Sequence, residues 1–173
     1  MGSQTNEDDV SSAPDMAPDE TGVFKVVMIQ PSHYDDDGYV IQWLRSAIPS
    51  NPLACLNGIA EDCRERQVLG PDVDIRTEIF DETNQRIRPD RIMRAIEQTG
   101  GHALIALVGV QTNQYPRALD IARAFRARDY AVCIGGFHVS GCLSMLDELH
   151  VTLAEAQEIG ISLFAGEAEE RRL

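Results

Sequence analysis

A short apolar run of this chain ends in two glycines, which are followed by Phe, His and a Ser–Gly pair ("VCIGGFHVSG", 132–141). Two other apolar runs also end at or near a glycine, Gly109 and Gly166. Glycine lets a bulky group approach the main chain, because it has no Cβ and tolerates positive φ. The pattern predicts a ligand that lies against bare backbone. The alternative is that these glycines simply end strands.

The elements that would position these glycines alternate between strand and helix. Strands are predicted at 23–31, 73–81, 103–110, 130–136 and 161–166 from β-branched and apolar runs. Capping signals and helical spacing predict helices after Ser50 or Asn51, from Pro89 to Gly100, near 115–128, and in 140–149 and 153–160. Such alternation predicts a doubly wound α/β fold: a five-stranded parallel sheet of order 2-1-3-4-5 with helices on both faces.

In a sheet of this kind, ligands lie beyond the carboxyl ends of the strands. Four segments are expected to meet there: Pro31–Gly38, Gly109–Asn113, Gly135–Gly141 and Gly166–Glu169. Glycines in several of these segments on one rim are stronger evidence for a ligand site than any single glycine.

Composition limits the function further. The chain has 173 residues, enough for one ordinary domain. Residues 1–22 hold six acids and no Lys or Arg, which predicts a disordered acidic tail before a domain at 23–170. Removing those six charges from the net charge of −13 leaves −7, so a basic nucleic-acid surface is disfavoured.

No apolar run approaches the roughly 20 residues that span a bilayer, and the N-terminus lacks the pattern of a signal peptide. The four cysteines form no CxxC pair, which indicates reduced thiols and a cytoplasmic protein with no membrane partner. Cys133 lies in an apolar strand and is interpreted as a small core residue.

Three segments carry a resemblance to a known family: "LVGVQTNQYPRAL" (107–119), "IGGFHVSG" (134–141) and "LFAGEAEE" (163–170). In their order and spacing on consecutive strands they resemble the cobalamin (vitamin B12)-binding N-terminal domain of radical S-adenosylmethionine proteins. The resemblance spans roughly residues 23–170. It implies a flavodoxin-like, Rossmann-like domain that holds the corrin ring over the strand ends and the nucleotide tail in a groove of the sheet.

The same resemblance implies roles for individual residues. Thr112 would bond the tail, the two glycines at 135 and 136 would let it pass, and Glu167 would bind corrin amides or a following domain. The cofactor-binding residues implied are Gln111, Thr112, Gly135, Gly136, Phe137, His138, Ser140, Gly166 and Glu167. No catalytic residue and no protein ligand to a metal is assigned. For His138, cofactor contact and local packing both stay open.

The loop after the first strand departs from a related pattern. Cobalamin domains of the methionine-synthase type carry a DxHxxG loop whose His ligates cobalt, but this chain reads "PSHYDDDGYVIQW" (31–43). His33 has the wrong spacing, so cobalamin is expected without a protein His on cobalt. The acids 35–37 are interpreted as a solvated loop rather than a metal site. Tyr34, Tyr39 and Trp43 either cover the ring or anchor the loop.

The family also needs a CxxxCxxC motif for its iron–sulfur cluster, and this chain has none. The expectation is therefore a truncated chain that is not catalytic alone. Its catalytic partner domain, in cis or in trans, would carry the [4Fe-4S] cluster and S-adenosylmethionine, with the corrinoid as a possible methyl carrier. The alternative is a degenerate flavodoxin-like module that binds no cofactor and acts through protein contacts. A phosphorelay receiver is disfavoured, because the third strand lacks an Asp and the only Lys, Lys25, lies in the first strand.

Overall fold

The chain folds into a five-stranded, all-parallel sheet of order β2-β1-β3-β4-β5. The structure is a computed structural model that describes residues 22–43, 50–145 and 150–168. The predicted acidic tail lies outside these residues except for Gly22, which already belongs to the first strand. The elements in chain order are β1 (Gly22–Gln30), α1 (Asn51–Glu65), β2 (Val73–Asp81), α2 (Pro89–Glu97), β3 (Ala103–Leu107), α3 (Tyr115–Arg126), β4 (Ala131–Gly135), α4 (Phe137–Met145), α5 (Val151–Glu158) and β5 (Ser162–Phe164). The predicted flavodoxin-like α/β fold is confirmed.

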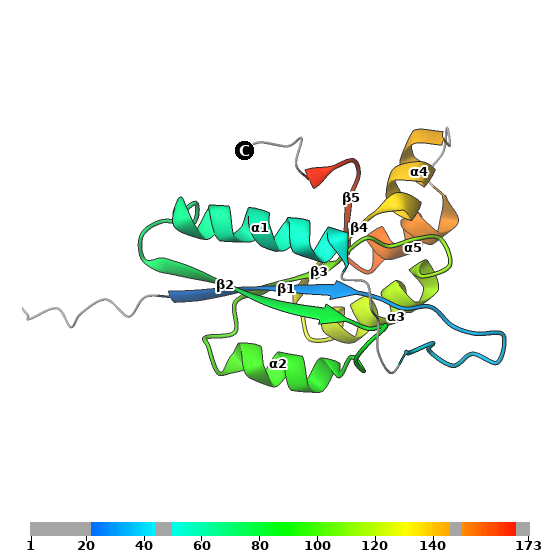
Figure 1. Cartoon of the computed structure of the whole chain (residues 1–173), viewed down its shortest axis with the longest axis horizontal. Coiled ribbons are helices and arrows are strands. Elements are labelled where there is room, and N and C mark those ends of the chain that lie inside the picture. Colours follow the sequence, from blue (N-terminus) through cyan, green and yellow to red (C-terminus); the bar gives the residue numbers. More distant parts are fainter. Residues whose placement is uncertain (1–21, 44–49, 146–149, 169–173) are drawn as a thin grey trace, which may run out of the picture.

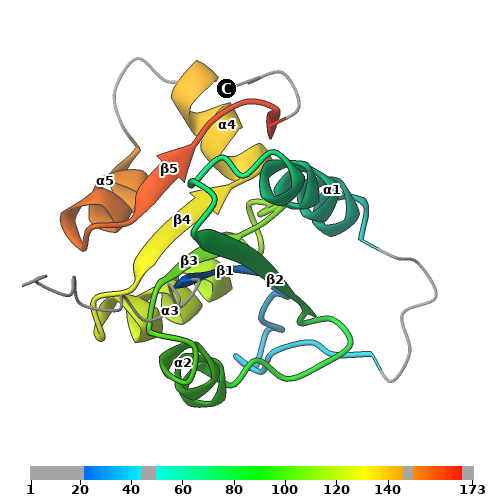
Figure 2. The same ribbon diagram turned by 90° about the vertical axis from the view of Figure 1, so that its left-hand side faces the viewer.

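Helices cover both faces of the sheet (Figure 1). On one face α1 packs Leu53 and Ala60 against Met28 of β1. On the other face α2, α3 and α5 bury their apolar side chains with Val27 and Ile29 in the larger core. The view in Figure 2 shows α1 on the side of the sheet opposite α2 and α3. The alternation of β1 residues between the two cores follows from the two-residue period of a strand.

Local signals in the sequence account for the first helix and for the edge of the sheet. The Ser50 hydroxyl accepts a hydrogen bond from the Leu53 N–H (3.3 Å), and Pro52 occupies the first turn of α1. β2 lies at an edge of the sheet and leaves Ile79 42% exposed, in keeping with the alternation of apolar and polar residues in "VDIRTEIFD".

The only lysine of the chain connects three elements near the start of β1. Lys25 is 6% exposed, and its Nζ donates to Glu78 Oε1 of β2 (2.5 Å) and to the Ala95 carbonyl of α2 (3.0 Å). Because a buried ammonium group needs such partners, this contact holds the last turn of α2 against β1 and β2.

The "IGGFHVSG" stretch differs from its prediction. A turn was expected there, with a helix beginning near residue 140, but β4 ends at Gly135 and α4 begins at Phe137. Gly136 alone connects them, with φ of +136°. A residue without a Cβ can make this change of direction in a single step. Among the described residues, no helix combines the length and apolar character needed to cross a membrane.

Candidate functional site

The segments that follow β3 and β4 are joined by main-chain hydrogen bonds at the carboxyl end of the sheet. The Val110 N–H donates to the Gly135 carbonyl (3.0 Å), and the His138 N–H donates to the Val110 carbonyl (3.0 Å). Two of the four segments predicted to meet at this rim are therefore in direct contact. Their backbones are held as one unit on which the first turn of α4 rests.

Close contacts within the protein explain why positions 135 and 136 are occupied by glycine. A Cβ on Gly136 would lie 2.3 Å from the Val110 nitrogen and 2.7 Å from the Gly109 carbonyl carbon. A Cβ on Gly135 would lie 3.3 Å from the Cβ of Phe164 on β5. The large group that approaches this backbone is thus the neighbouring strand end of the same chain. The two glycines therefore allow the strand ends to pack closely together, and they are not independent evidence for a ligand.

His138 points inward, beneath the rim. It is 7% exposed, its ring lies 4.3 Å from the Tyr115 ring between centroids, and its Nδ1 lies 3.4 Å from Thr112 Oγ1. Burial, with a smaller contribution from the charge of His150, lowers the pKa of His138. Of the two roles left open for His138, this geometry favours local packing.

An open hollow of about 530 Å³ lies beside this unit, lined by Gln111, Thr112, Asn113 and Phe137. The ring of Phe137 is 74% exposed, although it stands on the first turn of a helix. Three of these four residues were predicted to bind the cofactor. Asn113 was missed as a binding residue, although it lay within the segment Gly109–Asn113 that was expected at the rim.

The end of β5 joins the same site through α4. The Ser140 hydroxyl accepts a hydrogen bond from the Gly166 N–H (3.1 Å). Gly166 has φ of +88°, and a Cβ on Gly166 or on Gly141 of α4 would enter open space. Glu167, the next residue, is exposed. The structure thus brings together the predicted residues of three strand ends.

The loop after β1 is held on the opposite side of the strand ends from α4 (Figures 1 and 2). The carboxylate of Glu82, just after β2, is buried at 1% exposure and receives the Ser32 N–H (3.1 Å). Arg117 of α3 donates to both oxygens of this carboxylate through Nε and to one through Nη2 (2.6 Å). Tyr34 donates its hydroxyl proton to Asp120 of α3 (2.7 Å). Burial alone would lower the pKa of Arg117, but its hydrogen bonds to Glu82 and Tyr34 raise it instead.

This loop clamp, consisting of Glu82, Arg117, Ser32 and Tyr34, was not predicted, since a lone Glu in a polar stretch carries no signal that it will be buried. Of the three aromatic residues, Tyr34 anchors the loop through this clamp, whereas Tyr39 and Trp43 are 73% and 64% exposed.

The three acids of this loop form an ordinary turn. Asp35 Oδ1 accepts the N–H groups of Asp37 (3.1 Å) and Tyr39 (2.7 Å). No group of three or more metal-ligating side chains occurs among the residues that the structure describes. The three acids are exposed, as expected for a solvated loop.

On the α1 face, small side chains of β4 and β5 leave part of the sheet open. Ala131 and Ser162 are exposed, and Cys133 and Phe164 are half-buried. Desolvation raises the pKa of the Cys133 thiol to about 11, so this thiol stays protonated at neutral pH. α1 packs on this face against Met28 of β1 and Val108 just after β3, and α4 stands on the same side beyond the ends of β4 and β5. The starts of β4 and β5 are therefore uncovered on this face, whereas nearer the rim Phe164 packs over Gly135.

Comparisons of this chain with protein-family models, with curated proteins and with solved structures find no match.

Proposed function

We propose that this chain is a cobalamin-binding domain of the kind found in radical S-adenosylmethionine enzymes, with the corrinoid at the carboxyl ends of β3, β4 and β5. The observation that carries the proposal is the hollow beside Phe137, where the ends of β3 and β4 form one bonded unit joined to the end of β5. A flat ring with amide side chains needs an apolar surface, polar groups at its edge and space. All three occur here.

The residues around the hollow fit such a ring. Phe137 offers an exposed aromatic face, and the side chains of Gln111, Thr112 and Asn113 offer hydrogen-bond donors and acceptors. Gly166 leaves room at the edge, because nothing lies within 4 Å of the position of its missing Cβ. The nucleotide tail is proposed to run along β4 and β5 on the face beside α1, where Ala131 and Ser162 are exposed. When bound, the corrinoid supplies a cobalt centre that can carry a methyl group.

The chain is proposed to hold this cofactor without a histidine on cobalt. The ring of His138 packs on Tyr115 under the rim, and His33 belongs to the loop that Glu82 and Arg117 tie to the far side. The proposed role of the chain is to bind and orient the corrinoid for a separate catalytic domain, which would hold the iron–sulfur cluster and S-adenosylmethionine.

A second candidate is a module of the same fold that binds no cofactor and acts through protein contacts. Two observations favour it: Gly136 is required by the protein's own backbone, and His138 points inward. α4 contains no charged residue yet leaves Phe137, Leu143 and Met145 exposed at 74%, 43% and 82%, which also suits a protein interface.

Retention of hydroxocobalamin separates the two functions. The purified chain is mixed with a twofold excess of hydroxocobalamin and desalted, and its visible spectrum is recorded. Bound corrinoid at close to one per chain is expected. A colourless protein with the circular dichroism of an α/β fold would reject the cofactor and leave the interaction module.

A pair of variants tests the location. Phe137 has an exposed area of roughly 150 Å², and a flat ligand covers about half of it, which at about 25 cal/mol per Å² contributes ~2 kcal/mol. Phe137→Ala should therefore weaken binding about 30-fold by the conversion of ~1.4 kcal/mol per factor of ten. Leu69→Ala, at a 48% exposed site in the turn between α1 and β2, is the matched control and should leave the affinity unchanged. Equal affinities of the two variants would place the corrinoid elsewhere.

A further inference from the structure

Four arginines lie within nine residues, from the segment just before α2 to the last turn of this helix. Arg86, Arg88, Arg91 and Arg94 are all exposed, and Asp90 is the single acid between them. This arginine patch contrasts with the chain as a whole, which carries 28 acids, 15 Lys and Arg, and a net charge of −13. A local excess of one charge in a chain of the opposite charge creates a field that attracts acidic groups.

The guanidinium groups of the arginine patch lack carboxylate partners within the described part of the chain. Exposed Arg64, Arg66 and Arg76 each form an ion pair with a nearby acid. Among the described residues none of the four patch arginines does so, and Arg94 instead donates a hydrogen bond from its Nε to the Asp90 carbonyl (3.1 Å). The patch therefore has unused capacity for carboxylates.

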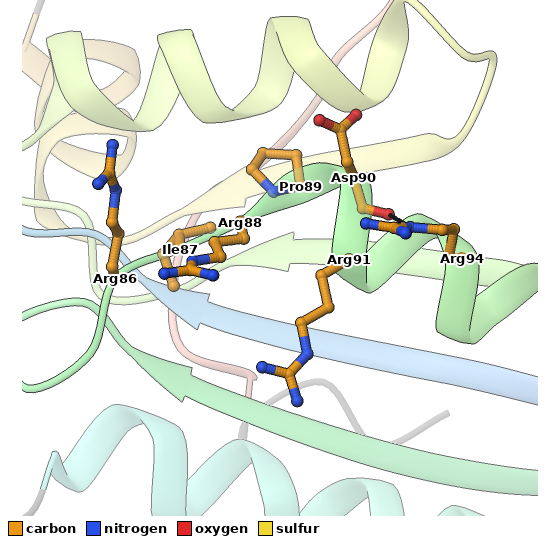
Figure 3. A pocket seen from close by; sticks show the side chains of 7 residues that line it. All are labelled: Arg86, Ile87, Arg88, Pro89, Asp90, Arg91 and Arg94. Carbon is orange, nitrogen blue, oxygen red and sulfur yellow. Dashed lines mark hydrogen bonds between the residues drawn. The ribbon is translucent and has the colours of Figure 1, made fainter.

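The arginine patch surrounds a hollow of about 400 Å³ that is also lined by Ile87, Pro89 and Asp90 (Figure 3). Arg86 and Arg88 project from the segment before α2, whereas Arg91 and Arg94 project from the helix itself. The four side chains fan out rather than converge on one point. This arrangement suits an extended chain with several carboxylates better than one small anion.

We infer that the arginine patch is a docking surface for the acidic segment 1–20 of the same chain. That segment contains Glu7, Asp8, Asp9, Asp15, Asp19 and Glu20 and no Lys or Arg. Its negative charge is complementary to the positive charge of the arginine patch. Because the segment is covalently connected to β1, its effective concentration at the patch is in the millimolar range.

The point where the described structure begins allows this contact. β1 starts at Gly22, and Lys25 of β1 donates to the Ala95 carbonyl in the last turn of α2. From Ala95 back to Pro89 at the start of α2 the distance is about 9 Å at 1.5 Å per residue. Glu7, Asp8 and Asp9 lie 13 to 15 residues before Gly22 and span up to about 45 Å when extended, so these three acids reach every arginine of the patch.

Arginine-specific modification tests this docking with controls in the same molecule. The full chain and a chain lacking residues 1–20 react with phenylglyoxal at about 20 mM salt, and peptide mass mapping gives the rate at each arginine. The four patch arginines should react at least about three times more slowly in the full chain than in the shortened one. Arg64, Arg66 and Arg76 should react equally in both. The protection should disappear at 0.5 M salt, because ions screen exposed charge pairs.

Further variants decide what occupies the patch. A full chain with the six acids changed to Asn or Gln should lose the protection, and protection that remains would overturn the inference. Equal rates in the full and shortened chains would overturn it too. Protection that rises with protein concentration would assign the patch to the acidic segment of a second copy and reject docking within one chain. Circular dichroism of each variant checks that the α/β fold is intact.

Discussion

Replacement of Gly136 by alanine is expected to destabilise the domain strongly. The new Cβ would lie 2.3 Å from the Val110 nitrogen, 2.7 Å from the Gly109 carbonyl carbon and 2.8 Å from the Val110 carbonyl oxygen. All three are main-chain atoms, which cannot move aside as the end of a flexible side chain can. The two strand ends must therefore separate.

The size of the effect follows from three contributions. A φ of +136° in a residue with a Cβ costs about 1–3 kcal/mol. Separation of the strand ends weakens the hydrogen bonds Val110 N–H to Gly135 and His138 N–H to Val110, at about 1 kcal/mol each. A loss of about 3–5 kcal/mol is expected, against a total stability of about 5–15 kcal/mol for a typical domain.

Gly141→Ala is the control for this experiment. Gly141 lies in the same stretch, on α4, and a Cβ there meets nothing within 4 Å. Because alanine favours a helix over glycine, this variant should gain about 0.5–1 kcal/mol. Urea unfolding followed by far-ultraviolet circular dichroism measures both variants. A loss below about 1 kcal/mol for Gly136→Ala, or a larger loss at Gly141, would refute the account of how the rim is built.

Three other predictions concern the surroundings of the site. Glu82→Gln should cost about 3–5 kcal/mol in urea unfolding, since it leaves the partly buried guanidinium of Arg117 without its charged partner, and a second change of Arg117 to Met should recover part of this loss. His138 has a lowered pKa in the folded state, so the unfolded chain takes up a proton first as the pH falls below about 6.5. Stability should therefore fall over that range, and His138→Gln should flatten the curve. If the variant keeps the full slope, another group is responsible. Ser140→Ala removes the acceptor of the Gly166 N–H, which should speed hydrogen exchange of that amide while costing about 1 kcal/mol. An unchanged exchange rate would contradict the bond.

The fold could be predicted because the sequence pattern of each strand and helix extends over several consecutive residues. β3 is a continuous apolar run and β1 is rich in Val and Ile, as in the centre of a parallel sheet, and Ser50 with Pro52 marks the start of α1. The strand order then follows from the alternation of strands and helices.

The site could be predicted only in part. The order of the strand ends was enough to place Thr112 near His138 and Ser140 near Gly166. The inward direction of the His138 ring depends on Tyr115, a packing partner in another element, which no local pattern reveals. The need for glycine at position 136 could not be predicted either, because the atoms that exclude a Cβ there belong to the main chain of Gly109 and Val110.

The loop clamp around Glu82 has a consequence for the order of folding. It joins Ser32 to Glu82 across 50 residues and Arg117 to Glu82 across 35 residues, so three distant parts of the chain must already be in place before the carboxylate is buried. The sheet pairings span equal or longer separations, such as Lys25 with Ala103, but the clamp additionally needs the completed ends of β1 and β2 and the α3 helix beside them. We therefore expect the sheet to assemble first and the β1 loop to close last, and the same loop to open first in native-state hydrogen exchange.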